Sequence, residues 1–171
     1  KQFFSYVAQK QMPQFWSDYD RGVLSFQQVA QALAQYRGVE EEYAASMIRI
    51  AISRQEAIKP TERLIVDLKA AGYKLYVLSN MAREFIDFLR QQSVYKNFDG
   101  EVVSCEEGVV KPMPEIYDIL LSRFALSPEE TMFIDDREEN VVAAQQKGIF
   151  VYHFNRNDYE GSCEQLRKML L

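Results

Sequence analysis

The stretch Thr131–Asn140, "TMFIDDREEN", places two adjacent aspartates directly after a short apolar segment. The segment "MFI" shows no alternation of apolar and polar residues, which is typical of a strand buried on both faces. A helical pattern then begins and runs to Gly148. Two neighbouring carboxylates at a buried strand end would repel each other unless a cation lies beside them. The stretch therefore predicts a parallel α/β fold with a cation site at a strand end.

Short apolar strands and amphipathic helices also alternate on either side of this stretch. Strands are expected at residues 73–80, 100–105, 131–136 and 149–154. Helices are expected at residues 59–72, 82–92, 113–126, 137–148 and 163–171. Strands that alternate with helices are joined by crossovers, which give a mainly parallel sheet with helices on both faces. Residues 59–171 are therefore expected to form an α/β core.

Residues 1–58 show no strand pattern, and their apolar residues recur at helical spacing. Ser25 is suited to cap a helix that begins at "FQQVAQALAQY", and Gly38 is suited to end it. Two apolar helix faces are expected, one with Val29, Leu33 and Tyr36 and one with Met47, Ile50 and Ala51. These residues are predicted to form a small helical unit.

Composition excludes several classes of function. The net charge of -5 argues against nucleic-acid binding, which needs a basic face. No apolar run approaches the roughly 20 residues that cross a bilayer. Cys105 and Cys163 lack metal-site spacing, and we interpret them as free thiols of a reducing compartment, the cytoplasm. His153, the single histidine, excludes His-rich zinc sites, and we expect it to be a half-buried residue at a strand end. Nothing in the sequence reports the oligomeric state, for which a monomer is the default.

Three other polar residues lie at positions where ligands collect in a parallel sheet. Ser79 and Asn80 follow the strand "YKLYVL", where a hydroxyl and helix-start N–H groups can hold phosphate oxygens. Lys111 lies in a stiff loop before a helix, where an ammonium can neutralise a phosphate and a nearby carboxylate. The alternatives are turn and cap chemistry for the Ser-Asn pair and a solvated surface charge for the lysine.

The aspartate pair has its own alternative, in which one carboxylate only caps the following helix. That interpretation accounts for one aspartate but not for both. A hard divalent cation with oxygen ligands, Mg²⁺, accounts for Asp135 and Asp136 together.

The order of these features resembles the haloacid dehalogenase-like hydrolase superfamily. Ser79 matches its second motif, Lys111 its third, and "DDREEN" its fourth. The segments "YKNFDGEVVSCEEGVVKPMPEIY" and "FIDDREENVVAAQQKGI" are most similar to the branch of bacterial sugar-phosphate phosphatases and the amino-terminal phosphatase domain of soluble epoxide hydrolase. The resemblance implies a Rossmann-like parallel sheet over residues 59–171 and part of a helical cap over residues 1–58.

The resemblance also implies roles for individual residues. Asp136 would bind Mg²⁺, and Asp135 would hold a metal-bound water from the outer shell. Ser79, Asn80 and Lys111 would bind the phosphate, with Lys111 also catalytic. Asn140 occupies a position where many relatives have another aspartate. The nucleophile of this family is an aspartate on the first strand, which forms an aspartyl-phosphate.

A second candidate for that nucleophile is "SDYDRG", which contains Asp18 and Asp20. The residues before it, "MPQFWS", have no strand pattern, so we interpret both aspartates as polar groups in a cap turn. The family's first strand, which lies between the strands at 73–80 and 131–136, would then be missing from residues 1–171. We expect the natural polypeptide to carry it upstream.

The predicted function is Mg²⁺-dependent hydrolysis of a small phosphorylated metabolite, similar to a sugar phosphate. One alternative is a non-catalytic binding or interaction protein that keeps the fold, and another is a haloacid dehalogenase. Phe15, Trp16 and Tyr19 are expected either to pack in the cap core or to line the substrate pocket. No nucleic-acid or membrane partner is expected.

Overall fold

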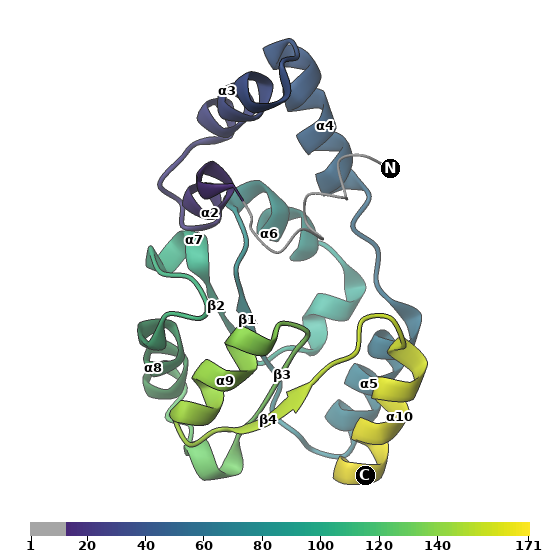
Figure 1. Ribbon diagram of the computed structural model, residues 1–171. Helices are drawn as coiled ribbons and strands as arrows, with labels where there is room; N and C mark the ends of the chain where they lie inside the picture. Colours follow the sequence, from purple (N-terminus) through teal and green to yellow (C-terminus); the bar gives the residue numbers. More distant parts are fainter. Residues whose placement is uncertain (1–12) are drawn as a thin grey trace. The chain divides into compact units, whose positions relative to one another are not determined.

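The chain forms two compact units in the computed structural model, which describes residues 13–171 (Figure 1). The helical unit comprises Lys1–Gln55, Asn80–Gln91 and Val103–Val110, and residues 1–12 of it lie outside the described part. The α/β unit comprises Glu56–Ser79, Gln92–Val102 and Lys111–Leu171. The predicted division into a cap over residues 1–58 and a core over 59–171 stays a prediction.

From residue 13 onward, the helical unit contains three consecutive helices and two short ones from later in the chain. They are α2 (Gln14–Asp20), α3 (Phe26–Arg37), α4 (Glu41–Ser53), α6 (Arg83–Leu89) and α7 (Ser104–Glu107). Ser25 caps α3 in a reciprocal capping box with Gln28, and Gly38 ends the helix in the left-handed conformation. Both predicted ends of this helix are confirmed.

Alanines and branched aliphatic residues form the buried core of α3 and α4. Val29 and Leu33 are buried as expected, together with Ala30, Ala34, Ala44, Ala45 and Ile48. The expectation that Tyr36 and Ile50 belong to the core faces is wrong, since these side chains are 53% and 52% exposed. The buried face of α3 runs through Val29 to Ala34 and that of α4 through Ala44 to Ala51, and Tyr36 and Ile50 lie outside these faces.

The aromatic residues of α2 pack within the helical unit. Tyr19 is buried, and Phe15 and Trp16 pack against the same core. The rings of Trp16 and Tyr19 meet edge to face with centroids 5.8 Å apart. The hydroxyl of Tyr19 donates to Glu84 of α6 at 2.5 Å. These contacts agree with the core interpretation of the three aromatic residues.

The α/β unit contains the expected strands and, except for the helix at residues 82–92, which is α6 of the helical unit, the expected helices. Its elements are α5 (Lys59–Ala70), β1 (Tyr76–Ser79), η1 (Ser93–Asn97), β2 (Gly100–Val103), α8 (Pro114–Arg123), η2 (Pro128–Glu130), β3 (Met132–Asp135), α9 (Glu138–Gln146), β4 (Phe150–His153) and α10 (Tyr159–Leu170). Helix α10 begins four residues earlier than residue 163, because the carboxylate of Asp158 accepts from the N–H of Gly161 and caps it.

The strands of the described residues form two pairs, β1 with β2 and β3 with β4. The second pair is parallel, with Met132 opposite Phe150 and Asp135 opposite His153. Helices α5 and α10 pack side by side against one face, where they contact Met132 and Tyr152 (Figure 1). On the other face Tyr117 of α8 meets the ring of Phe133 edge to face at 5.5 Å. The predicted α/β class with helices on both faces is confirmed.

The segment "SDYDRG" ends helix α2, and Asp18 and Asp20 lie in its last turn. The buried hydroxyl of Ser104 donates to the carbonyl of Asp20 and accepts from the N–H of Met81. Gly22 follows in the left-handed conformation, and its Cα lies close to the backbone of Cys105. This turn therefore joins three segments of the helical unit.

Within residues 13–171, no helix is both long and apolar enough to cross a membrane.

A Gly22→Ala substitution is expected to destabilise the protein more than Gly38→Ala. Both residues have a left-handed φ, +74° and +66°, so both alanines carry a conformational cost of about 1–2 kcal/mol. A Cβ at Gly22 would lie 2.5 Å from the carbonyl oxygen of Cys105, whereas a Cβ at Gly38 meets nothing within 4 Å. Urea denaturation of both variants measures the difference, and equal losses would contradict the close approach at Gly22.

Candidate active site

Lys111 joins the carboxyl ends of β1 and β3. Its Nζ donates to the carbonyl oxygen of Leu78 at 2.8 Å and to Oδ2 of Asp135 at 2.7 Å. The two charged side chains are only 10% and 8% exposed, and the ammonium lies 5.3 Å from the ring centroid of Phe133. The lysine is therefore not a solvated surface charge but half of a buried ion pair.

The other oxygen of Asp135 is held by two further donors. Its Oδ1 accepts from the backbone N–H of Arg137 at 2.9 Å and from Nδ2 of Asn140 at 3.0 Å. Three donors therefore orient this carboxylate, and one of them is cationic. The role of Asp135 as an outer-shell metal residue stays a prediction; its contacts in this structure are to Lys111 and to the start of α9.

Asp136 differs from its neighbour because its side chain is 39% exposed. Its Oδ2 lies 3.5 Å from Nη1 of Arg156, which is a long ion pair. Its backbone oxygen accepts from Nε2 of His153 at 3.1 Å. His153 ends β4 as expected, but the imidazole is exposed and not half-buried. The strand-end histidine therefore orients the backbone of the aspartate that faces solvent.

The remaining predicted residues follow β1. Ser79 is the last residue of that strand and is half-buried, directly after the carbonyl group that accepts from Lys111. Asn80 begins the segment Asn80–Gln91, which belongs to the helical unit. The α/β unit thus places Ser79, Lys111 and the two aspartates at the carboxyl ends of β1 and β3, the edge where parallel sheets bind ligands.

Sequence reasoning missed the residues that hold the aspartates in place, namely Arg156, His153 and the amide of Asn140. The alternation of side chains between the two faces of β3 provides part of the signal that sequence reasoning did not use. Phe133 and Asp135 share one face of β3, and both side chains are about nine-tenths buried. The buried face of the strand therefore identifies Asp135 as the aspartate that needs an internal cation, and Asp136 as the one left near solvent.

The two cysteines are free thiols, as expected. Burial is the largest cause that raises the pKa of Cys105 and of Cys163 above the ordinary value. A raised pKa keeps a thiol protonated at neutral pH, whereas thiol nucleophiles need a lowered one. Neither cysteine is therefore suited to nucleophilic catalysis.

A magnesium ion would find one suitable protein ligand here. Among residues 13–171, no group of three or more His, Cys, Asp or Glu side chains could hold a metal ion. Mg²⁺ in phosphate-handling sites is commonly held by one or two carboxylates, several waters and the substrate phosphate. The half-exposed carboxylate of Asp136 fits that donor set, while Asp135 is already held by three hydrogen-bond donors.

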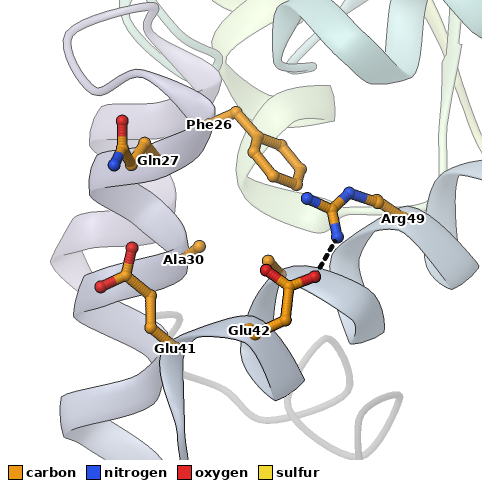
Figure 2. A pocket seen from close by; sticks show the side chains of 7 residues that line it. Phe26, Gln27, Ala30, Glu41, Glu42 and Arg49 are labelled. Carbon is orange, nitrogen blue, oxygen red and sulfur yellow. Dashed lines mark hydrogen bonds and ion pairs between the residues drawn. The ribbon is translucent and has the colours of Figure 1, made fainter.

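A groove of about 490 Å³ lies apart from these residues, between α3 and α4 of the helical unit (Figure 2). It is lined by Phe26, Gln27, Ala30, Glu41, Glu42, Ala45 and Arg49. Arg49 pairs with Glu42 at 2.8 Å and lies over the ring of Phe26. The paired side chains are 55% and 80% exposed, so solvent screens them. The groove contains none of the predicted site residues and is not the candidate site.

A Lys111→Met substitution is expected to lower the free energy of unfolding by about 3 kcal/mol or more, since it leaves a carboxylate buried without its counter-charge. Lys147→Met is the matched control. Lys147 pairs with Asp118 at the same 2.7 Å distance, but that aspartate is 58% exposed. Removing the control pair is expected to cost less than about 1 kcal/mol.

Chemical denaturation of both variants checks this expectation. Similar losses for the two lysines would mean that the Asp135 carboxylate is not isolated from water. In that case Lys111 would not be the residue that holds β1 and β3 together.

Comparison with known proteins places the chain among hydrolases. A family model described as haloacid dehalogenase-like hydrolase matches residues 7–148. A sesquiterpene phosphatase of Aspergillus oryzae is 29% identical over 159 residues, which are 91% of this chain and 79% of that protein. Mouse bifunctional epoxide hydrolase 2 is 28% identical over 104 residues, 58% of this chain but only 19% of that protein.

A solved structure supports the fold. A HAD family enzyme from Bacteroides thetaiotaomicron, an aspartate-to-alanine mutant in complex with magnesium and inorganic phosphate, superposes with a TM-score of 0.67. It is 24% identical, and the match covers 82% of this chain and 75% of that one. The family model alone spans most of the sequence. The chain therefore belongs to the haloacid dehalogenase-like hydrolase family.

Proposed function

We propose that this protein is a Mg²⁺-dependent phosphomonoester hydrolase that acts on a small phosphorylated metabolite. The observation that carries the proposal is the buried ammonium of Lys111 between the ends of β1 and β3, 2.7 Å from Asp135. A fixed cation at this edge of the sheet is suited to a phosphate group, whose charge grows on the leaving oxygen as the ester bond breaks.

Each residue of the site contributes one property to this reaction. Lys111 neutralises phosphate charge from a position that needs no rearrangement, because Asp135 already orients it. Ser79 supplies a hydroxyl at the end of β1, and Asn80 an amide in the next position. Asp136 supplies a carboxylate that solvent reaches.

Mg²⁺, when bound, would add positive charge beside the phosphate oxygens and orient the ester. Asp136 is the residue of this chain that would hold it. The solved relative in complex with magnesium and phosphate supports this part of the proposal. Asp135 would act indirectly, through Lys111.

The mechanism implied by the family resemblance requires a carboxylate that attacks phosphorus and displaces the alcohol. Water then hydrolyses the aspartyl-phosphate, which releases inorganic phosphate and restores the carboxylate. Asp18 and Asp20 lie in the last turn of α2, and the α/β unit contributes Asp135 and Asp136. The attacking carboxylate on a first strand therefore stays a prediction. Residues 13–171 account for phosphate binding and charge neutralisation.

The proposal also includes the class of substrate, the cap and the compartment. The name of the Aspergillus oryzae sesquiterpene phosphatase supports an ester of a small organic alcohol, and the resemblance favours sugar phosphates among these. Residues 1–58 would act as the cap that selects the alcohol. The two free thiols support a reducing compartment such as the cytoplasm.

An Asp136→Asn substitution in the full natural chain tests the metal role. Release of inorganic phosphate from a generic phosphomonoester such as para-nitrophenyl phosphate is followed while Mg²⁺ is titrated. The variant is expected to need about 10- to 100-fold more Mg²⁺ for half-maximal activity, because it loses its one charged ligand from this chain.

The matched control is Glu138→Gln, which removes one exposed carboxylate two residues away. It is expected to keep the wild-type Mg²⁺ requirement. An unchanged requirement in Asp136→Asn would refute the metal role. Halide release from a 2-haloacid in metal-free buffer, without phosphatase activity, would favour the dehalogenase alternative instead.

A further inference from the structure

Asn140 is a buried amide with one satisfied end and one unsatisfied end. It lies in the first turn of α9 and is 2% exposed. Its Nδ2 donates to Asp135, whereas its Oδ1 has no hydrogen-bond partner within the described residues. A buried carbonyl without a partner costs about 1–3 kcal/mol. The hydrogen bond that the NH₂ end donates to Asp135 must therefore offset this cost.

The orientation of this amide follows from its partner. Both oxygens of an ionised carboxylate only accept hydrogen bonds, so only the NH₂ end of Asn140 can face Asp135. The reversed amide would place two acceptors 3.0 Å apart. The unsatisfied oxygen is therefore the consequence of the donor that is directed at Asp135.

Tyr117 fixes the helix turn that carries this amide. Its hydroxyl donates to the backbone oxygen of Asn140 at 2.9 Å, and the tyrosine is fully buried. Burial, with a smaller contribution from the charge of Asp135, raises the pKa of Tyr117 well above its usual range. The phenol therefore stays a donor, and Val141 and Ala144 bury the same face of α9.

The contacts form one continuous series, from Tyr117 through Asn140 and Asp135 to Lys111. Asn140 and the N–H of Arg137 occupy Oδ1 of Asp135, which leaves Oδ2 directed at the ammonium. We infer that Asn140 is a positioning residue for Lys111 and acts through Asp135. The expected effect of Asn140 on kcat rests on the proposed function. Its expected coupling to Lys111 in stability rests on the buried contacts alone.

The neutral amide is suited to this position for an electrostatic reason. Lys111 and Asp135 form a pair with no net charge, and both are about nine-tenths buried. Asn140 adds a donor without adding a charge, so the pair stays balanced where desolvation is costly. Asp136, the carboxylate near solvent, then remains the negative group that can hold a cation.

A double-mutant cycle between Asn140→Ala and Lys111→Met in the full natural chain tests the inference. With para-nitrophenyl phosphate and saturating Mg²⁺, Asn140→Ala alone is expected to lower kcat about 10- to 100-fold and to change KM less. In the Lys111→Met background the same substitution is expected to cause no further loss, since the residue it positions is gone. Additive losses in kcat would overturn the inference.

The matched control is Asn97→Ala. Asn97 also donates from Nδ2, to the carbonyl of Val94 at 2.9 Å, and this partner lies in η1, outside the site. It is expected to keep the wild-type kcat and to give additive losses with Lys111→Met. Equal losses of kcat for Asn97→Ala and Asn140→Ala would indicate general destabilisation and count against positioning.

Urea unfolding of the same variants separates this inference from the proposed function. Asn140 and Lys111 are expected to be coupled, so that the double variant shifts the midpoint by less than the sum of the single shifts. If the wild type releases no phosphate, the proposed function fails while this coupling can still be measured. Additive midpoint shifts would contradict the connection through Asp135.

Discussion

The buried pair of Lys111 and Asp135 connects parts of the α/β unit that no strand pairing connects. In the described residues β1 pairs with β2, and β3 pairs with β4. The ammonium donates to a carbonyl of β1 and to a carboxylate of β3, at 2.8 and 2.7 Å. Desolvation offsets most of the attraction in such a pair, so its net contribution to stability is small while both partners are present. Its effect is geometric, because it fixes where the two strand ends lie relative to one another.

The same lysine also satisfies a backbone group. The carbonyl of Leu78 lies at the end of β1, and a backbone acceptor without a donor would cost about 1–3 kcal/mol if it were buried. The ammonium of Lys111 donates to this carbonyl and to Asp135, so it is already oriented before a substrate binds. Preorganisation of this kind is what electrostatic catalysis requires, since the cation need not be reoriented when charge develops on the phosphate.

Local patterns predicted the elements of this fold, and tertiary contacts decided what the patterns could not. Periodicity and capping residues such as Ser25 and Gly38 identified the helices correctly, because these signals act within a few residues. The same periodicity misplaced Tyr36 and Ile50, since the buried faces of α3 and α4 are centred on other residues, such as Leu33 and Ile48. The order of polar strand ends predicted the site, whereas the partners of each aspartate depended on residues brought in from the loop before α8, from the start of α9, and from β4 and the loop after it.

The two adjacent aspartates have different roles because one side chain is buried and the other is exposed. Asp135 shares the face of β3 that Phe133 buries, and it is neutralised there by Lys111. Asp136 follows the strand end, where its carboxylate is half-exposed and forms only a long ion pair with Arg156, at 3.5 Å. A divalent cation gains most from a carboxylate that has not already been neutralised, so the exposed position is the better ligand. Burial of one carboxylate beside a lysine therefore leaves the other available to the metal, which explains why this site uses a pair.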